Sequence, residues 1–341
     1  MSRWIQTPMN RRDLLRNGCR LGCGLALGAP LHAGESAELP LITKPIPSSG
    51  ERLPVVGLGT IWFRDAQYEA LRAEIARFSE LGGTLLDTAA AYGESEGVIG
   101  RAVADLGLRK RLFLATKFDA GGTMPMPPPG APAGGASPLP GPPEGIARPA
   151  RDGVGGLASF ERSLVRLKTD QIDLLQVHSL NGVATLLPQL LSWKQAGRIR
   201  YIGVTTSSVA QHSELIEVMR SYPLDFIQVD YSLANREAEA AVFPEALKRK
   251  VAVLANLPLG RATLIAQAAQ RPLPPWAADF DVSSWSQFFL KYVVSHPAVT
   301  CAIPGSLKLE HLVDNQAAAR GRLPDGAMRR RMEALWESLP S

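Results

Sequence analysis

The feature that most constrains the fold of this 341-residue chain is a regular alternation of apolar runs with amphipathic stretches. The apolar runs are rich in Leu and β-branched residues and lack polar alternation, which is typical of parallel strands buried on both faces. They fall at 56–59, 84–88, 112–116, 172–177, 200–204, 226–229, 251–255 and 300–303. Eight strand–helix units in about 260 residues predict an α/β fold, a (β/α)8 TIM barrel, in preference to an open doubly wound sheet.

The amphipathic stretches are expected to form the outer helices of this barrel. The predicted helices are 67–81, 95–106, 160–167, 185–196, 209–221, 237–249, 286–294 and 311–319. Ahead of the first barrel strand, residues 41–46 and 53–56 flank the turn sequence Pro47-Ser48-Ser49-Gly50. This pattern predicts an N-terminal β-hairpin.

A Pro/Gly-rich segment, residues 121–156, interrupts the alternation after the third barrel strand. Runs such as Met126-Pro127-Pro128-Pro129-Gly130 disfavour helix and central strand, so the segment is predicted to be a low-complexity loop. It would emerge at the C-terminal face of the barrel, where active sites form. Two interpretations stay open: a loop that faces the substrate, and a tolerated surface insertion.

Residues 1–33 have the composition of a targeting signal rather than of a folded domain. Asn10-Arg11-Arg12-Asp13-Leu14-Leu15-Arg16 precedes a weakly apolar run from Leu21 to Leu31, and Leu31-His32-Ala33 offers a cleavage point. The segment resembles a twin-arginine (Tat) export signal, which implies recognition by the Tat export machinery and a periplasmic location for residues 34–341. The alternative interpretation is a frayed basic tail on a cytoplasmic protein. With Cys19 and Cys23 in the signal, the exported chain would keep Cys301, predicted to be a buried and inert small hydrophobe.

The charge distribution argues against nucleic-acid and membrane partners. The formal net charge is +5, and the first 33 residues contribute +4 of it, so the body of the chain is nearly neutral. No apolar run reaches the roughly 20 residues that a membrane span requires. The run Arg329-Arg330-Arg331 is interpreted as an exposed helix face. No sequence feature indicates an oligomer, and a monomer is the default expectation.

Four polar, titratable side chains follow three successive predicted strands. Asp87 and Tyr92 lie five residues apart in Leu86-Asp87-Thr88-Ala89-Ala90-Ala91-Tyr92-Gly93-Glu94-Ser95-Glu96, Lys117 ends the next strand, and His178 ends the one after that. Because the C-terminal ends of parallel barrel strands meet at one face, these side chains are expected to converge above the barrel axis.

These motifs resemble the aldo-keto reductase superfamily over about residues 41–337. The matching segments are 87–96, Tyr201-Ile202-Gly203-Val204, Gln228-Val229-Asp230-Tyr231-Ser232-Leu233, and Ala302-Ile303-Pro304-Gly305-Ser306 through Asn315. The resemblance implies an NAD(P)H-dependent oxidoreductase that reduces an aldehyde or ketone by hydride transfer. It further implies that Tyr92 is the general acid and that His178 orients the substrate. Lys117, held by Asp87, is expected to lower the pKa of the Tyr92 phenol.

The resemblance also implies which residues would bind the nicotinamide end of the cofactor. Gln228 matches a residue that binds the nicotinamide carboxamide in the family. Thr205 and Thr206 occupy positions usually held by Ser and Asn, and Asn256 replaces an aromatic ring that stacks on the nicotinamide. An amide offers less contact area than such a ring.

At the adenosine end, Ser306 matches the family pattern and Asn315 is expected to reach the adenine. His311 replaces an Arg that contacts the 2′-phosphate, and Lys308 is expected to supply the missing positive charge. We therefore expect NADP(H) in preference to NAD(H).

A second hypothesis follows from the altered cofactor positions Asn256, Thr206 and His311. The chain would then be a non-catalytic binding or regulatory protein on the same barrel, with a weakened cofactor site. The intact set Asp87, Tyr92, Lys117 and His178 favours the enzyme. The histidines show no metal-ligand spacing, and no metal is expected.

Overall fold

The computed structural model describes residues 39–118 and 154–339. The predicted export signal and nearly all of the predicted Pro/Gly-rich loop lie outside these ranges. The described chain contains an eight-stranded parallel sheet with neighbours in the order β3 to β10. Its strands are β3 (Leu58–Gly59), β4 (Leu85–Asp87), β5 (Phe113–Phe118), β6 (Ile172–Val177), β7 (Ile199–Thr205), β8 (Phe226–Asp230), β9 (Ala252–Asn256) and β10 (Val299–Ala302).

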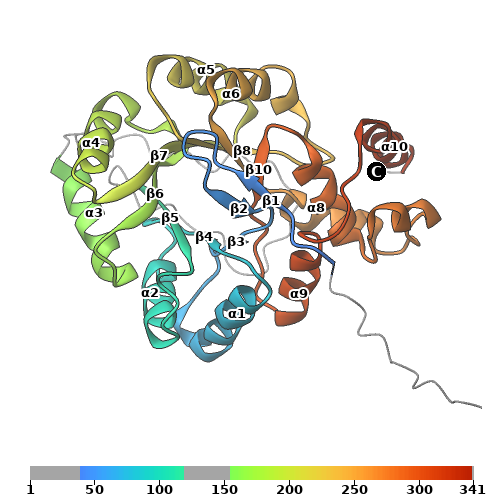
Figure 1. Ribbon diagram of the computed structural model, residues 1–341, viewed down its shortest axis with the longest axis horizontal. Coiled ribbons are helices and arrows are strands. Elements are labelled where there is room, and N and C mark those ends of the chain that lie inside the picture. Colours follow the sequence, from blue (N-terminus) through green and yellow to red (C-terminus); the bar gives the residue numbers. More distant parts are fainter. Residues whose placement is uncertain (1–38, 119–153, 340–341) are drawn as a thin grey trace, which may run out of the picture. The chain divides into compact units, whose positions relative to one another are not determined.

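The sheet closes on itself, as Figure 1 shows along the barrel axis. Parallel bridges join Val56, just before the short β3, to Ala302, and Gly59, the last residue of β3, to Gly305. A side chain at Gly59 would place its Cβ 2.9 Å from the Ile303 carbonyl oxygen, so glycine permits this close approach. The (β/α)8 barrel expected from the strand–helix alternation is confirmed.

Helices surround the barrel (Figure 1). They are α1 (Tyr68–Glu80), α2 (Ser95–Asp105), α3 (Val154–Leu167), α4 (Val183–Gln195), α5 (His212–Ser221), α6 (Val242–Arg249), α7 (Thr263–Ala268), α8 (Trp285–Ser295), α9 (Leu309–Ala317) and α10 (Gly326–Ser338). Helix α3 begins at Val154, six residues earlier than predicted, so the last three residues assigned to the Pro/Gly-rich loop are helical. In the described part of the chain no helix is both long and apolar enough to cross a membrane.

Alternate residues of each strand face the helices and the barrel interior. Leu86 and Leu114 pack in the layer between sheet and helices. The interior holds a separate apolar cluster of Ile46, Leu53, Leu85, Phe113, Ala115, Leu174, Tyr201, Phe226, Ala252, Leu254, Cys301 and Ile303. Cys301 is fully buried, as expected, and burial raises the pKa of its thiol, which keeps it protonated and unreactive.

The predicted N-terminal hairpin is confirmed as β1 (Thr43–Pro45) paired antiparallel with β2 (Arg52–Pro54). In Figure 1 it lies across the middle of the barrel, and Ile46 and Leu53 belong to the interior cluster. The hairpin therefore plugs the end of the barrel where the strands begin. Lys44 Nζ fastens β1 by donating to the carbonyl oxygens of His296 and Val299 at 2.8 and 2.7 Å.

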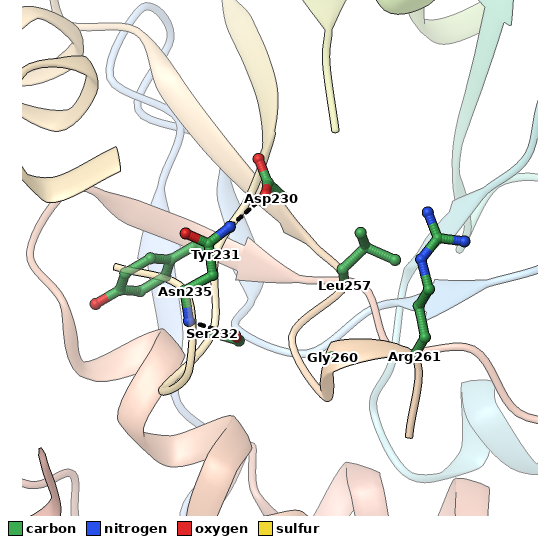
Figure 2. A pocket seen from close by; sticks show the side chains of 7 residues that line it. All are labelled: Asp230, Tyr231, Ser232, Asn235, Leu257, Gly260 and Arg261. Carbon is green, nitrogen blue, oxygen red and sulfur yellow. Dashed lines mark hydrogen bonds between the residues drawn. The ribbon is translucent and has the colours of Figure 1, made fainter. Parts of the chain in front are cut away.

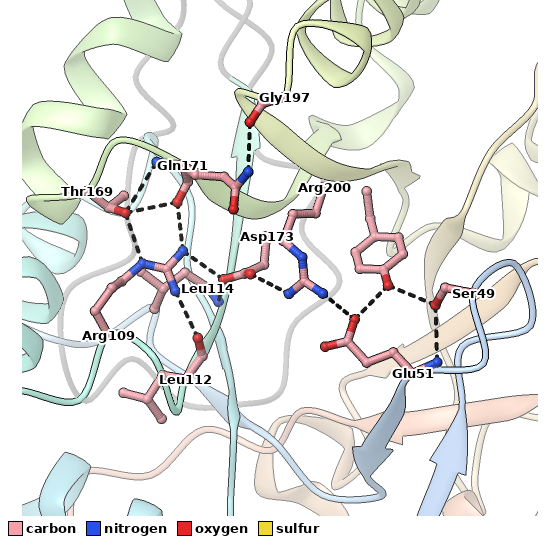
Figure 3. Close-up of polar contacts among 11 residues, drawn as sticks. Ser49, Glu51, Arg109, Leu112, Leu114, Thr169, Gln171, Asp173, Gly197 and Arg200 are labelled. Carbon is pink, nitrogen blue, oxygen red and sulfur yellow. Dashed lines mark hydrogen bonds and ion pairs between the residues drawn. The ribbon is translucent and has the colours of Figure 1, made fainter.

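A polar network ties this plug to the strands (Figure 3). The buried carboxylate of Asp173 accepts hydrogen bonds from Arg200 Nη1 at 2.7 Å and from the Leu114 backbone N–H at 2.8 Å, and it pairs with Arg109 at 3.0 Å. Arg200 also binds Glu51 in the hairpin turn. The contacts at this end of the barrel stabilise the fold. The four titratable side chains singled out in the sequence lie at the other end.

The arginine run in α10 is not uniformly exposed, which corrects the prediction. Arg330 and Arg331 are exposed, but Arg329 is 9% exposed. Its guanidinium donates to the Tyr231 hydroxyl at 2.7 Å and to Glu239 Oε1 at 2.9 Å. These hydrogen-bond partners of Arg329 come from segments distant in the sequence, so the local sequence does not reveal that Arg329 is buried.

Candidate active site

The structure brings the four chemistry-bearing side chains together at the C-terminal end of the strands. Asp87 is the last residue of β4, Lys117 lies near the end of β5, and His178 directly follows β6. Lys117 Nζ lies 2.6 Å from Asp87 Oδ2 and 4.9 Å from the centroid of the Tyr92 ring. The rings of Tyr92 and His178 meet edge-on, with centroids 6.0 Å apart. The predicted convergence is confirmed.

The Lys117–Asp87 ion pair forms the buried base of the site. The Lys117 ammonium also donates to the Thr88 carbonyl oxygen at 2.9 Å. Burial alone would lower the pKa of Lys117, but the Asp87 carboxylate and the Tyr92 phenol outweigh it and raise that pKa. Burial raises the pKa of Asp87, and Lys117 opposes this shift. The charge on Lys117 is therefore held in place next to Tyr92.

The pKa of Tyr92 departs from the expected direction. Burial raises the pKa of its phenol, and the nearby Lys117 charge only partly opposes that effect. Lys117 acts as predicted, but the prediction of a net lowered pKa is wrong because desolvation is the larger influence. Tyr92 consequently keeps its proton at neutral pH and is able to donate it.

His178 is neutral. Burial, together with the Lys117 charge, lowers its pKa to about 3. It can therefore orient an acceptor oxygen through a ring N–H and not through a full positive charge.

The loop that carries Tyr92 is held by hydroxyl groups that the sequence interpretation missed. Ser95, the first residue of α2, is fully buried. Its Oγ lies 2.8 Å from both Thr60 Oγ1 and Thr88 Oγ1, and it donates to the Thr60 carbonyl oxygen at 2.9 Å. These contacts join the loops after β3 and β4, so Tyr92 is presented by a fixed backbone.

The residues assigned to the nicotinamide end lie at the end of β7 (Thr205 and Thr206), in the middle of β8 (Gln228) and at the end of β9 (Asn256). Gln228 Nε2 donates to Asp87 Oδ2 at 3.3 Å, and Asn256 Nδ2 donates to the Thr206 carbonyl oxygen at 3.0 Å. Gln228 Oε1 and Asn256 Oδ1 are buried and have no protein donor. Thr205 is buried and its Oγ1 accepts the Ser179 backbone N–H at 3.0 Å. Two oriented acceptors thus remain for a ligand that carries N–H groups.

The residues assigned to the adenosine end divide into buried and exposed pairs. Ser306 Oγ bonds with the backbone of Lys308 at the start of α9, and Asn315 Oδ1 accepts the Ser286 hydroxyl at 2.9 Å. The Asn315 carbonyl is therefore committed to packing between α8 and α9. His311 is exposed, and Lys308 Nζ lies 4.0 Å from Glu310 Oε1. Lys308 is positioned as an available surface cation.

A pocket of about 170 Å³ opens beside Asn256, between the chain segments that follow β8 and β9. Figure 2 shows its lining, which includes Asp230, Asn235, Leu257 and Arg261. Asp230 accepts a hydrogen bond from the Asn235 side chain. None of the four convergent side chains lines this pocket. Across residues 39–118 and 154–339, no group of three or more His, Cys, Asp or Glu is placed to hold a metal.

Gln176 was also missed by the sequence interpretation. It is fully buried, and neither its Oε1 nor its Nε2 has a protein partner. It pairs in register with Lys117 on β5 and with Gly203 on β7. Its place two residues before His178 was the available signal, since a strand period of two puts both on the interior side.

Comparisons with known proteins agree with this geometry. A sequence model described as "Aldo/keto reductase family" matches residues 55–336. The chain is 32% identical over 207 residues to aldo-keto reductase YhdN of Bacillus subtilis, covering 58% of this chain and 54% of that protein. It is 28% identical over 226 residues to aldo-keto reductase yakc [NADP(+)] of Schizosaccharomyces pombe, covering 63% and 60%. The chain thus spans little more than half the length of these two relatives.

One further relative and one solved structure match this chain over a larger share of their own length. Methylglyoxal reductase YeaE of Escherichia coli is 29% identical over 293 residues, which cover 80% of this chain and 88% of that protein. A crystal structure of an aldo-keto reductase from Klebsiella pneumoniae in complex with NADPH has a TM-score of 0.68 at 24% identity. That match covers 87% of this chain and 96% of the other. The structural match supports the fold.

Proposed function

The chain belongs to the aldo/keto reductase family. We propose on this premise that it is an oxidoreductase that reduces an aldehyde or ketone with NADPH, using Tyr92 as the general acid. The observation that carries the proposal is the buried Lys117–Asp87 ion pair beside the rings of Tyr92 and His178. A relative named for NADP(+) supports the choice of cofactor, and one named for methylglyoxal supports small carbonyl substrates.

The protein's own part in the reaction is to place and protonate the carbonyl oxygen. Tyr92 keeps its proton at neutral pH because burial raises the pKa of its phenol. When that proton passes to the substrate oxygen, the phenolate left behind faces the Lys117 ammonium, which stabilises it. Neutral His178 directs a ring N–H at the same oxygen and so orients the carbonyl. Asp87 keeps Lys117 charged and oriented throughout.

Residues on β8 and at the end of β9 fit a nicotinamide cofactor. Gln228 Oε1 and Asn256 Oδ1, both buried without a protein donor, match the N–H groups of a carboxamide. Lys308, exposed at the start of α9, would meet a 2′-phosphate. When bound, the reduced cofactor supplies the hydride that the carbonyl carbon accepts.

The test combines cofactor binding with turnover by residues 34–341. We expect saturable micromolar NADPH binding by fluorescence titration, and oxidation of NADPH in the presence of methylglyoxal or 4-nitrobenzaldehyde. Tyr92→Phe removes the donated proton, so it should abolish turnover and leave the NADPH dissociation constant within about twofold. Tyr222→Phe, at a partly buried position at the end of α5, is the matched control and should retain full activity. Equal turnover in Tyr92→Phe and the native protein would overturn the assignment of the acid.

The same measurement decides between the enzyme and a non-catalytic barrel. A folded protein that binds NADPH but turns over none of these carbonyls would favour the binding or regulatory role. The altered residues Asn256, Thr206 and His311 are the sequence features that favour this second candidate.

For the N-terminal segment we propose Tat-dependent export to the periplasm. The support is the Arg11-Arg12 pair ahead of the weakly apolar run from Leu21 to Leu31. Residues 1–40 fused to a folded reporter should direct it to the periplasm, and replacement of Arg11-Arg12 by Lys-Lys should keep it in the cytoplasm. Periplasmic delivery that survives the Lys-Lys replacement would rule out the Tat route.

A further inference from the structure

The backbone that follows His178 is held in an unfavourable conformation. Ser179 and Leu180 have φ values of 52° and 56°, in the left-handed region that non-glycine residues rarely adopt. They belong to a short 3-10 turn, His178–Leu180. Two successive left-handed residues persist only where the surrounding structure holds them. The turn that aims His178 therefore depends on contacts outside itself.

Both backbone polar groups of Ser179 are held by side chains of the following strand–helix unit. The Ser179 N–H donates to Thr205 Oγ1 at 3.0 Å. The Ser179 carbonyl oxygen accepts from Gln211 Nε2 at 3.2 Å. Gln211 is partly buried and ends the 3-10 turn Val209–Gln211 that leads into α5. One of the two side-chain hydrogen bonds to the Ser179 backbone is thus donated by the Gln211 amide.

The other end of the Gln211 amide reaches the residues assigned to the nicotinamide end. Gln211 Oε1 accepts the Thr206 hydroxyl at 2.6 Å. The Thr206 carbonyl oxygen in turn accepts from Asn256 Nδ2 at 3.0 Å. A continuous chain of hydrogen bonds therefore runs from the turn after β6, through Gln211, to the ends of β7 and β9.

We propose that Gln211 is a positioning residue for carbonyl reduction. It holds the turn after β6, and thereby the His178 ring, in a fixed orientation relative to the residues that would bind the nicotinamide. The inference rests on the proposed function. Neutral His178 acts through a directional N–H, and a hydrogen bond weakens steeply as its angle departs from linear. The turn must hold the ring while substrate binds, and Gln211 couples that turn to the strand ends that would hold the nicotinamide.

The chemistry of the amide explains why glutamine serves here. A single side chain must donate to the Ser179 carbonyl oxygen and accept from the Thr206 hydroxyl. Glutamate would accept from Thr206 but would set a carboxylate oxygen against the Ser179 carbonyl oxygen. Methionine has nearly the same length and can do neither. Comparing Gln211→Met with Gln211→Glu therefore separates loss of the whole link from loss of the donor.

The first readout is kinetic. In Gln211→Met and Gln211→Glu we expect kcat/KM for 4-nitrobenzaldehyde to fall about tenfold, as small misplacements of an orienting group do. The dissociation constant for NADPH and the midpoint of thermal unfolding should stay close to the native values. Gln195→Met, at the exposed end of α4, is the matched control and should change nothing. A general folding defect would lower kcat/KM and the unfolding midpoint and raise the dissociation constant for NADPH, and this combined result would overturn the positioning role.

A double-mutant cycle with His178→Ala shows whether Gln211 acts through the histidine. If it does, Gln211→Met costs about tenfold in the native background and nothing further in the His178→Ala background, measured in single-turnover reactions. An equal loss in both backgrounds would show that Gln211 acts on some other group. Native activity in Gln211→Glu would overturn the role of the donated hydrogen bond.

The last readout is independent of turnover. In protein labelled with ¹⁵N-histidine, the His178 signal is the one missing from His178→Ala. Gln211→Met should move this signal, and Gln195→Met should leave it in place. If the native protein reduces no carbonyl but the signal moves, the proposed function falls and the structural link stands. A signal that does not move, together with unchanged kcat/KM, would disprove the link.

Discussion

Lys117 and Asp87 form an ion pair of 2.6 Å whose two side chains are only 2% and 3% exposed. Each charge is tolerated inside the barrel because the other is present. Gln228 adds a third contact by donating to Asp87 Oδ2, whereas Asp87 Oδ1 has no protein donor. The pair therefore has little redundancy, and the loss of either partner should affect both stability and activity.

We expect Lys117→Met to lower the free energy of unfolding by about 3 kcal/mol at pH 8, since it leaves a buried carboxylate without its counter-charge. The cost should shrink towards pH 5, because burial raises the pKa of Asp87 and the lone carboxyl takes up a proton. Urea unfolding at the two pH values measures this difference. Lys110→Met, at an exposed lysine, is the control. A cost that is independent of pH would contradict a charged Asp87 in the variant.

Acid should destabilise the native protein through two partly buried, neutral histidines. Burial and Lys117 lower the pKa of His178 to about 3, and burial and Arg329 lower that of His296 to about 4. In the unfolded chain both take up protons near pH 6.5. Their stabilising contribution is thus complete above pH 6.5 and is lost as the pH falls towards 3, with about 1–2 kcal/mol per histidine gone by pH 5.

The measurement is the unfolding free energy between pH 7.5 and 5. His296→Asn keeps an acceptor for the Ala298 backbone N–H, which the native His296 Nδ1 accepts at 3.2 Å. This variant should flatten the pH dependence without changing turnover. An unchanged slope in His296→Asn would contradict a neutral native imidazole.

Lys308→Ala should weaken NADPH binding about tenfold and leave NADH binding unchanged, since a charge-assisted contact to the 2′-phosphate is removed. Glu310→Gln should act in the opposite direction, because Glu310 lies 4.0 Å from the Lys308 ammonium and competes for it. Fluorescence titration with both cofactors measures the effects, with Lys110→Ala as a charge-matched control. Equal weakening of NADPH and NADH would show that Lys308 does not meet the 2′-phosphate.

Asp173→Asn should destabilise the protein without altering the chemistry. The Asp173 carboxylate is 5% exposed at the plugged end of the barrel and serves both Arg109 and Arg200 (Figure 3). Losing its charge should cost about 3 kcal/mol of unfolding free energy, with kcat/KM of the folded enzyme unchanged. Glu161→Gln, which breaks an exposed pair with Arg198, should have no measurable effect. Equal stability of the two variants would contradict this role for Asp173.

The barrel and the convergence of the site could be predicted from local sequence because both follow from periodicity. Uninterrupted apolar runs specify strands buried on both faces, and parallel strands bring their C-terminal residues to one end. Asp87, Lys117 and His178 each stand at such an end. The hairpin was equally local, since its two strands and its turn are adjacent in the chain.

What could not be predicted depends on contacts between distant segments. Arg329 looks like its exposed neighbours, and only the packing of α10 against Tyr231 and Glu239 buries it. The net pKa shift of Tyr92 required the balance between desolvation and the Lys117 charge, which no sequence motif gives. Gln211 has no special pattern around it, and its link to Ser179 spans 32 residues.

The hairpin plug also has a practical consequence. Leu39, where the described domain begins, receives a hydrogen bond from Arg320 just after the C-terminal end of α9, on the side where the strands start. Tyr92 and His178 lie on the opposite side. An affinity tag, a reporter or an immobilising linker joined ahead of Leu39 should therefore attach to the back of the barrel and leave the entrance for cofactor and carbonyl clear.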